Sequence, residues 1–263
     1  MNRIDQLFRD KQENILSIYM TAGYPEREDT VPVIRSIAGA GADMIEVGMP
    51  FSDPLADGPV IQQSSHRALQ NGMTLDLLFR QLEGIRESVE IPLVLMGYLN
   101  PVLHYGMDRF LEKAAGVGVD GIILPDLPLY EFRLHYQDRF REAGLPLAML
   151  ITPQTPPERV EEIAAASGGF LYMVADSSTT GARDGISQKQ LDYFSRIGEM
   201  KLGIPRLIGF GISNHETFAT ACRFASGAII GSAFIRALEG EGFPDAKIHR
   251  FIKGVLGEKN IHI

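Results

Sequence analysis

The sequence predicts an α/β fold, a (β/α)₈ TIM barrel with a short N-terminal helix, from three observations. Short apolar runs recur along the chain, each is followed by a longer segment with helical spacing, and there are eight such units. Strands that alternate with helices pair in parallel through right-handed crossovers, and eight units favour closure into a barrel. A doubly wound open sheet of eight strands is the alternative that the pattern leaves open.

The eight expected strands are continuous apolar runs bounded by Gly, Pro or Asp, as is typical of parallel strands that are covered on both faces. The stretches after the second and the sixth strand are longer than the others. In this fold the segments after strands form the face that carries active sites, so these two loops are the first candidates for function. The strands are expected at residues 15–20, 44–47, 93–96, 121–124, 147–151, 170–174, 207–210 and 228–230.

The N-terminal segment, residues 1–13, is expected to form a short amphipathic helix. Ile4, Leu7 and Phe8 fall on one side of that helix, which suits a structural role in closing the bottom of the barrel. A length of 263 residues fits a barrel that occupies the whole chain, so residues 1–263 are expected to form one domain. Apolar residues make up 45% of the chain, which is enough for a sizeable core.

Composition also narrows the functional classes. A net charge of -8 disfavours a nucleic-acid partner, although a local cleft could still bind one small phosphate. No apolar run is long enough to span a bilayer, and the first residues lack a secretory signal. The single cysteine, Cys222, excludes an internal disulfide and a multi-cysteine zinc site, and the six histidines show no metal-ligand spacing. A cytoplasmic protein without a metal is expected.

Two carboxylates stand out after the second strand. Glu46 lies among apolar residues near the end of that strand, where burial raises a carboxyl pKa and prepares the group to exchange protons near neutral pH. A buried ion pair is the alternative role. The following loop, residues 50–59, is stiffened by three prolines and carries Asp53 and Asp57, which are either turn formers or part of an acid/base pair with Glu46.

The last two units each end in a glycine-rich turn, at residues 209–213 and 231–233. Turns after the seventh and eighth strands, next to helix N-termini, are the usual phosphate site of this fold, whereas tight strand-to-helix connections are the purely structural explanation. The long polar loop at residues 175–185 fits either a mobile lid or a plain surface loop. Tyr19 and Tyr172, near strand ends, either line a pocket for a flat ligand or pack the barrel.

The segment Ile45-Glu46-Val47-Gly48-Met49-Pro50-Phe51-Ser52-Asp53-Pro54-Leu55-Ala56-Asp57-Gly58-Pro59 resembles the signature of the tryptophan synthase α chain family. Similarity continues through residues 95–96, 100–101, 125–128, 177–181, 209–213 and 231–233, and so covers nearly the whole chain. The resemblance implies reversible aldol-type cleavage of indole-3-glycerol phosphate into indole and glyceraldehyde 3-phosphate. It also implies that no metal or organic cofactor is bound to this chain.

The resemblance assigns roles to individual residues. Glu46 matches the general acid/base, and Asp57 matches the carboxylate that stabilises positive charge on the indole N–H. Thr180 matches a lid threonine that closes toward Asp57. Backbone N–H groups for the phosphate, with Phe210 beside them, are implied at Gly181, Gly211, Gly231 and Ser232. Positions around the indole ring are implied at Tyr19, Ile61, Leu95, Ile151 and Tyr172.

The lid sequence departs from the family pattern. Many members carry Arg-Ser-Gly-Val-Thr-Gly, whereas this chain has Asp-Ser-Ser-Thr-Thr-Gly at residues 176–181. Loss of a glycine and reversal of a charge bear on lid dynamics rather than on the chemistry.

The resemblance further implies a partner, the β chain, which uses pyridoxal phosphate to join indole to serine in an α₂β₂ assembly. Residues 53–60, Asn100-Pro101 and 126–128 are implied to face it. Three alternatives differ from this reading. Barrel isomerases and epimerases share the glycine-rich turns but lack the second-strand motif. A non-catalytic barrel that only binds the β chain is disfavoured by the presence of Glu46 and Asp57. A stand-alone lyase that releases free indole needs the same active site, so the sequence leaves it open.

Overall fold

The computed structural model describes residues 2–175, 186–209, 211–240 and 242–257. Within them, eight parallel strands form one sheet in the order β4-β3-β2-β1-β8-β7-β6-β5. The two end strands also meet, because Ile122 and Leu147 form a parallel bridge and Ala148 N–H donates to the Ile122 carbonyl at 2.9 Å. The sheet is therefore closed, and the open-sheet alternative is wrong.

The strands lie where the apolar runs predicted them. They are β1 (Ile15–Thr21), β2 (Met44–Gly48), β3 (Leu93–Met96), β4 (Gly121–Ile123), β5 (Leu150–Ile151), β6 (Leu171–Val174), β7 (Arg206–Gly209) and β8 (Gly227–Ile230). Only β5 is much shorter than the expected 147–151. Met149 N–H donates to the Ser167 hydroxyl at 2.9 Å instead of to a strand, which interrupts the ladder there.

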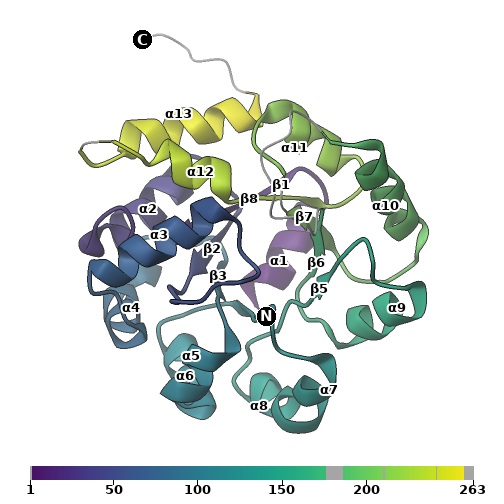
Figure 1. Cartoon of the computed structure of the whole chain (residues 1–263), viewed down its shortest axis with the longest axis horizontal. Coiled ribbons are helices and arrows are strands. Elements are labelled where there is room, and N and C mark those ends of the chain that lie inside the picture. Colours follow the sequence, from purple (N-terminus) through teal and green to yellow (C-terminus); the bar gives the residue numbers. More distant parts are fainter. Residues whose placement is uncertain (1, 176–185, 210, 241, 258–263) are drawn as a thin grey trace.

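The helices form a ring around the strands (Figure 1). Their apolar faces pack on the outer side of the sheet, with residues such as Ile34, Phe79 and Phe110 fully or almost fully buried. The helices are α1 (Arg3–Asp10), α2 (Thr30–Gly39), α3 (Pro59–Gln70), α4 (Leu75–Leu82), α5 (Leu99–Tyr105), α6 (Met107–Gly116), α7 (Leu129–Glu131), α8 (Gln137–Glu142), α9 (Pro157–Ala166), α10 (Gln188–Glu199), α11 (His215–Cys222), α12 (Ser232–Ala237) and α13 (Asp245–Leu256), with short η turns at Arg27–Asp29, Ile85–Glu87 and Phe132–Tyr136.

Strand residues alternate between two apolar layers. One set points outward to the helices, and the other fills the barrel interior as a packed core. The interior set includes Ile15, Met44, Val94, Met96, Ile123, Phe170, Tyr172, Leu207 and Ile229.

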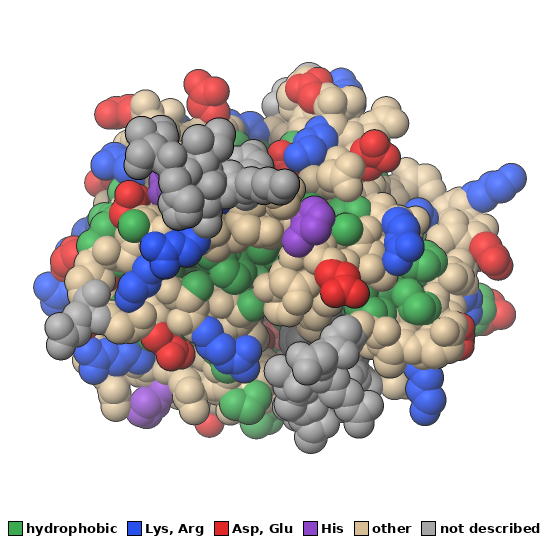
Figure 2. All heavy atoms as spheres, turned by 90° about the horizontal axis from the view of Figure 1, so that it is seen from above, with side chains coloured by type: hydrophobic (Ala, Val, Ile, Leu, Met, Phe, Trp, Pro, Cys, Tyr) green, Lys and Arg blue, Asp and Glu red, His purple; other side chains and the backbone are tan. Residues whose placement is uncertain are grey.

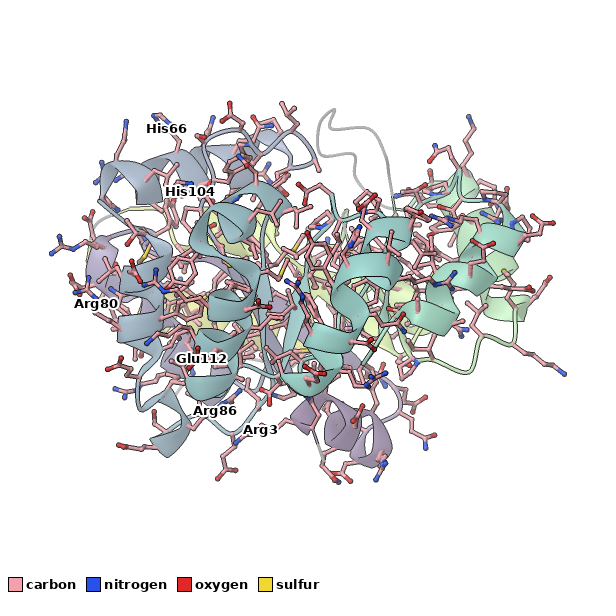
Figure 3. All side chains as sticks on the ribbon, turned by 90° about the horizontal axis from the view of Figure 1, so that it is seen from below. Arg3, His66, Arg80, Arg86, His104 and Glu112 are labelled. Carbon is pink, nitrogen blue, oxygen red and sulfur yellow. The ribbon has the colours of Figure 1, made fainter. Side chains whose placement is uncertain are left out.

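Helix α1 closes one end of the barrel, as the sequence predicted (Figure 1). Ile4 is 1% exposed and packs with the interior set, against Gly121 and Gly169, where a β-carbon would collide with it or press closely on it. Arg3 binds the Asp120 carboxylate at 3.1 Å, and Arg86 binds the other oxygen of the same group. Figure 3 shows Arg3 and Arg86 at this end of the molecule, whereas His66 and His104 lie at the opposite end.

Candidate active site

The candidate site lies at the C-terminal ends of the strands. Interior positions of β2 are Met44, Glu46 and Gly48, so strand alternation turns Glu46 into the barrel rather than toward the helices. In the parallel register, Glu46 stands beside Tyr19 on β1 and Val94 on β3. Glu46 is 0% exposed and has no cation among its hydrogen-bond partners in the described part of the chain, so a buried ion pair does not explain it.

Burial controls the proton affinity of Glu46. Loss of solvation raises the pKa of its carboxyl to about 8, and a hydrogen bond from the Ser17 hydroxyl opposes that rise. The Ser17 hydroxyl donates to Oε1 at 3.0 Å. The other oxygen, Oε2, is buried without a hydrogen-bond partner among the described residues. Glu46 therefore holds its proton at neutral pH.

The loop after β2 presents Asp57 on the same side of the barrel. Its carboxylate accepts a hydrogen bond from the Tyr98 hydroxyl at 3.0 Å, and that hydroxyl in turn accepts from Ala56 N–H at 3.1 Å. Burial raises the pKa of Asp57 to about 6, with the Tyr98 hydrogen bond acting in the opposite direction. Asp57 is thus ionised at neutral pH, while Glu46 is protonated.

The loop is held in a fixed shape, as its prolines predicted. Ser65 on α3 accepts from Phe51 N–H at 2.8 Å and donates to the Phe51 carbonyl at 2.9 Å. The rings of Phe51 and Tyr98 pack with their centroids 5.1 Å apart. These contacts anchor the start of the segment that carries Asp57. By contrast, Asp53 is exposed and makes a local hydrogen bond with its neighbour Ser52, which suits a turn former.

Two tyrosines link the carboxyl groups. Glu46 and Asp57 both act electrostatically on Tyr19 and on Tyr172, and together with burial they raise the pKa of both phenols. Glycines make room for these rings, because a β-carbon at Gly48 would collide with the Tyr19 hydroxyl and one at Gly209 with the Tyr172 hydroxyl. The structure therefore places four of the functional groups around one space, two carboxyls and two neutral phenols.

A cavity opens beside these groups. It is lined by Tyr19, Met49, Phe51, Asp57, Met96 and Tyr98, among others. Ile61, in the first turn of α3, is 7% exposed.

Two of the expected ring contacts are placed elsewhere. Leu95 belongs to the outward set that packs against the helices, and strand alternation turns its neighbour Met96 to the cavity instead. Ile151 packs in the same outer layer, whereas Leu150 contacts the interior set. The expectation that Leu95 and Ile151 face the indole ring is therefore corrected, with Met96 as the interior side chain at the end of β3.

The two glycine-rich turns follow neighbouring strands, since β7 pairs with β8. Gly211 has a φ of 79°, a left-handed conformation that favours glycine. Helix α11 is capped by its own Asn214 side chain, whereas α12 begins after Gly231 with no side-chain cap. No side chain of its N-cap residue satisfies the first backbone N–H groups of α12, which include that of Ser232. Thr180, Gly181 and Phe210 lie outside the described residues.

Sequence reasoning did not single out Tyr98 or Ser17. Tyr98 comes almost directly after a strand, where side chains reach the active face, and that position was a usable signal. Ser17 interrupts an apolar run two residues before Tyr19, which puts both on the same face of the strand. Their partners are 41 and 29 residues away, so neither contact could be read from the order of residues.

The fold and the site define a (β/α)₈ enzyme with a buried, protonated glutamate and an ionised aspartate at the C-terminal ends of its strands. A family model, "Tryptophan synthase alpha chain", matches residues 6–253. The chain belongs to this family, whose members are carbon–carbon lyases that cleave indole-3-glycerol phosphate.

Similar proteins agree with this assignment. The tryptophan synthase alpha chain of Flavobacterium psychrophilum is 50% identical over 256 residues, which cover 97% of this chain and 100% of the relative. That of Bacteroides thetaiotaomicron is 50% identical over 248 residues, covering 94% and 97%. Among solved structures, the alpha subunit from Legionella pneumophila is 35% identical with a TM-score of 0.86 and covers 98% of each chain. A chain of the tryptophan synthase complex from Pyrococcus furiosus is 32% identical with a TM-score of 0.85, covering 93% of this chain and 98% of its own.

Proposed function

We propose that this chain cleaves indole-3-glycerol phosphate with Glu46 as the general acid/base and Asp57 as the group that stabilises charge. The observation that carries the proposal is the placement of the two carboxyl groups, Glu46 buried with Oε2 unpartnered among the described residues and Asp57 bonded to Tyr98; burial raises their pKa values to about 8 and about 6. Two carboxyl groups in one site, one protonated and one ionised at neutral pH, provide an acid and an anion side by side.

In this reaction Glu46 first donates a proton and then accepts one, whereas Asp57 stays ionised and stabilises positive charge. Glu46 gives its proton to C3 of the indole ring, which makes the ring nitrogen positive and the ring an electron sink. The Glu46 carboxylate then takes the proton of the side-chain hydroxyl as the carbon–carbon bond breaks. The bond's electron pair returns to the ring to form indole, and the hydroxyl oxygen becomes the aldehyde of glyceraldehyde 3-phosphate. Glu46 ends protonated, and Asp57 faces the positive N–H throughout.

The rest of the site suits the two ends of this substrate. Tyr19, Tyr172, Met96 and Ile61 offer apolar surface for the ring. The phosphate is assigned to backbone N–H groups of Gly211, Gly231 and Ser232, supported by the uncapped start of α12. We also assign Gly181 and Phe210 to the phosphate and Thr180 to the lid, as the family resemblance implies; all three lie outside the described residues.

The described residues contain no group of three His, Cys, Asp or Glu side chains that could hold a metal ion. The proton transfers and the charge stabilisation are supplied by the two carboxyl groups, so we assign no cofactor to this chain. Pyridoxal phosphate belongs to the β chain.

A β chain is the proposed partner, in an α₂β₂ assembly that takes up the indole. Support comes from apolar side chains that are exposed in the described structure: Leu55 is 85% exposed, Tyr130 69%, Leu134 58% and Leu103 46%. They lie on or beside the segments after β2, β3 and β4 that were expected to face the partner.

Elsewhere, the face in Figure 2 interleaves acidic and basic side chains, which gives no basic field for nucleic acid. None of the described helices is long and apolar enough to cross a membrane. We propose a cytoplasmic location.

The test is cleavage of indole-3-glycerol phosphate by the purified chain, followed as indole release, with and without a β chain and serine. Slow cleavage alone and faster turnover with the partner support the proposal, whereas fast partner-independent release points to a stand-alone lyase. Absence of cleavage under both conditions would overturn the function.

Variants at the two carboxyl groups test their roles. We expect Glu46→Gln to lower kcat by about 10³-fold or more with little change in substrate affinity, because the amide cannot carry the proton. Asp57→Asn should lower kcat by about 10²-fold, since the neutral amide stabilises the positive ring less well. Asp53→Asn is the matched control on the same loop and should retain the wild-type turnover of the isolated chain, measured without a β chain because residues 53–60 are assigned to the partner face. Undiminished cleavage in either active-site variant contradicts its assigned role.

A further inference from the structure

Ser17 is an unusual residue for its position. It is 0% exposed and points into the barrel from the middle of β1, between Ile15 and Tyr19 on the same face. Its neighbours in register on the adjoining strands are Met44 on β2 and Ile229 on β8, both apolar. A hydroxyl in such surroundings is costly unless it is hydrogen-bonded, and the recorded acceptor is Glu46 Oε1 at 3.0 Å.

From this geometry we propose that Ser17 is a positioning residue that decides which oxygen of Glu46 carries the catalytic proton. The hydroxyl donates to Oε1, which is thereby the acceptor oxygen of the carboxyl group. The proton of the neutral acid then resides on Oε2, the oxygen that lacks a partner among the described residues. The proposal rests on the role given to Glu46 above and adds the source of its orientation.

The strand register explains why Ser17 contacts the Glu46 carboxyl group from the α1 end of the barrel. Ser17 pairs with Met44, while Tyr19 pairs with Glu46, so Ser17 lies one interior level nearer the α1 end of the barrel. A hydrogen bond from that level holds Oε1 toward the packed core, and we assign the unpartnered Oε2 to the substrate side. Because Ser17 donates to Oε1, this oxygen needs no water molecule as a hydrogen-bond partner. The Glu46 carboxyl group therefore stays desolvated and keeps one orientation.

Other groups around Glu46 define what the pH profile reports. The titratable side chains that interact with it are Tyr19 on β1 and Tyr172 on β6, and Asp57 acts on the same two phenols. Both phenols have raised pKa values and stay neutral in the working range. Asp57 must ionise, which sets the acid limb near its pKa of about 6, and Glu46 must keep its proton, which sets the alkaline limb near about 8.

The experiment measures the pH profile of kcat/KM, which reports the pKa values of the free enzyme, for indole release by Ser17→Ala and Ser17→Cys. The serine hydrogen bond favours the ionised carboxylate, so its removal should move the alkaline limb upward by about one pH unit, while the maximal kcat falls about tenfold and KM stays within about twofold. Ser17→Cys preserves the size of the side chain and offers a weaker hydrogen-bond donor. The midpoint of its alkaline limb should therefore fall between those of the wild type and Ser17→Ala. If the alanine variant does not fold, the cysteine variant decides.

Ser36→Ala is the matched control, because it removes a buried serine hydroxyl that donates to a carboxylate, Asp245, at 2.7 Å on the outside of the barrel. The alkaline limb of the Ser36→Ala pH profile should have the same midpoint as that of the wild type. An unmoved alkaline limb in both Ser17 variants would overturn the proposal, even if kcat falls, because a loss of packing alone does not change the titration.

A second measurement separates this proposal from the proposed function. In protein labelled with ¹³C at the glutamate carboxyls, the resonance that disappears in Glu46→Gln reports the titration of Glu46 directly. An upward shift of its midpoint in Ser17→Ala supports the hydrogen bond without any reference to activity. A protein that fails to cleave the substrate but shows this shift would overturn the lyase assignment and leave the Ser17 contact standing.

Discussion

Glu46 keeps a proton that a solvated glutamate would release, because the folded chain removes water from the carboxyl group without supplying a cation. The pKa rises from 4.5 to about 8. A carboxyl with a higher pKa in the folded chain binds more protons there than in the unfolded chain between the two values. The free energy of unfolding therefore falls as the pH rises through this window, with the stabilising contribution complete below about 4.5 and lost above about 8.

Glutamine at position 46 removes this titration. We expect Glu46→Gln to gain stability relative to the wild type as the pH rises from about 4.5 to about 8, and the gain at the upper end should be about 2–5 kcal/mol. Urea denaturation at a series of pH values measures the difference. A constant difference between pH 5 and pH 8.5 would show that the carboxyl is not the group that limits stability there.

The sequence located Glu46 and Asp57 because an isolated carboxylate in an apolar strand and a proline-rich acidic loop are local signals. It did not locate Tyr98, whose hydroxyl becomes relevant only when two loops from different units meet. It also predicted an inward-facing Leu95, whereas the structure turns Leu95 to the helices and Met96 to the interior. The inward or outward direction of a residue depends on the strand's register in the barrel.

At the scale of elements, all eight strands followed from apolar runs, since parallel strands covered on both faces leave a continuous hydrophobic signal. The shortening of β5 did not, because it depends on the Ser167 hydroxyl, which takes the Met149 N–H from the sheet. The capping of α11 by Asn214 could be read from the sequence only after the start of the helix was known.

A substitution in helix α1 tests how much the closure of this end of the barrel stabilises the fold. We expect Ile4→Ala to lower the free energy of unfolding by about 2–4 kcal/mol, because the cavity left between Gly121 and Gly169 is walled by strands that cannot collapse into it. Leu7→Ala, on the same helix but only half-buried, is the control and should cost less. Thermal or urea unfolding compares the free energies of unfolding of the two variants. Equal losses would argue against a stabilising role of Ile4 at the closed end of the barrel. Cleavage per folded molecule should not change, since α1 lies at the end opposite the active site.

At the scale of the whole molecule, barrel closure is uneven. Strands β1 and β2 pair over five residues, whereas in the described part of the chain a single bridge, between Ile122 and Leu147, joins β4 to the segment just before β5. Local opening requires the loss of few contacts where the ladder is thin. We expect the amide protons of Ile122 and Ala148, which bridge this junction, to exchange faster than that of Ile45 in β2. Native-state hydrogen exchange measures these rates, and equal protection would mean that the helices, not the ladder, hold the junction.

The same junction divides the chain into two sets of four neighbouring strands, which otherwise join where β1 pairs with β8. Glu46 and Asp57 belong to the first set, and Tyr172 and the turn at Gly231 to the second. A break in the main chain between Ala143 and Gly144 would therefore leave two pieces, one with both carboxyl groups and the other with Tyr172 and the glycine-rich turns. Indole could form only after the two pieces had associated. The β4–β5 junction is therefore a suitable place to divide the chain into a split enzyme, in which indole release measures the association of the two fragments.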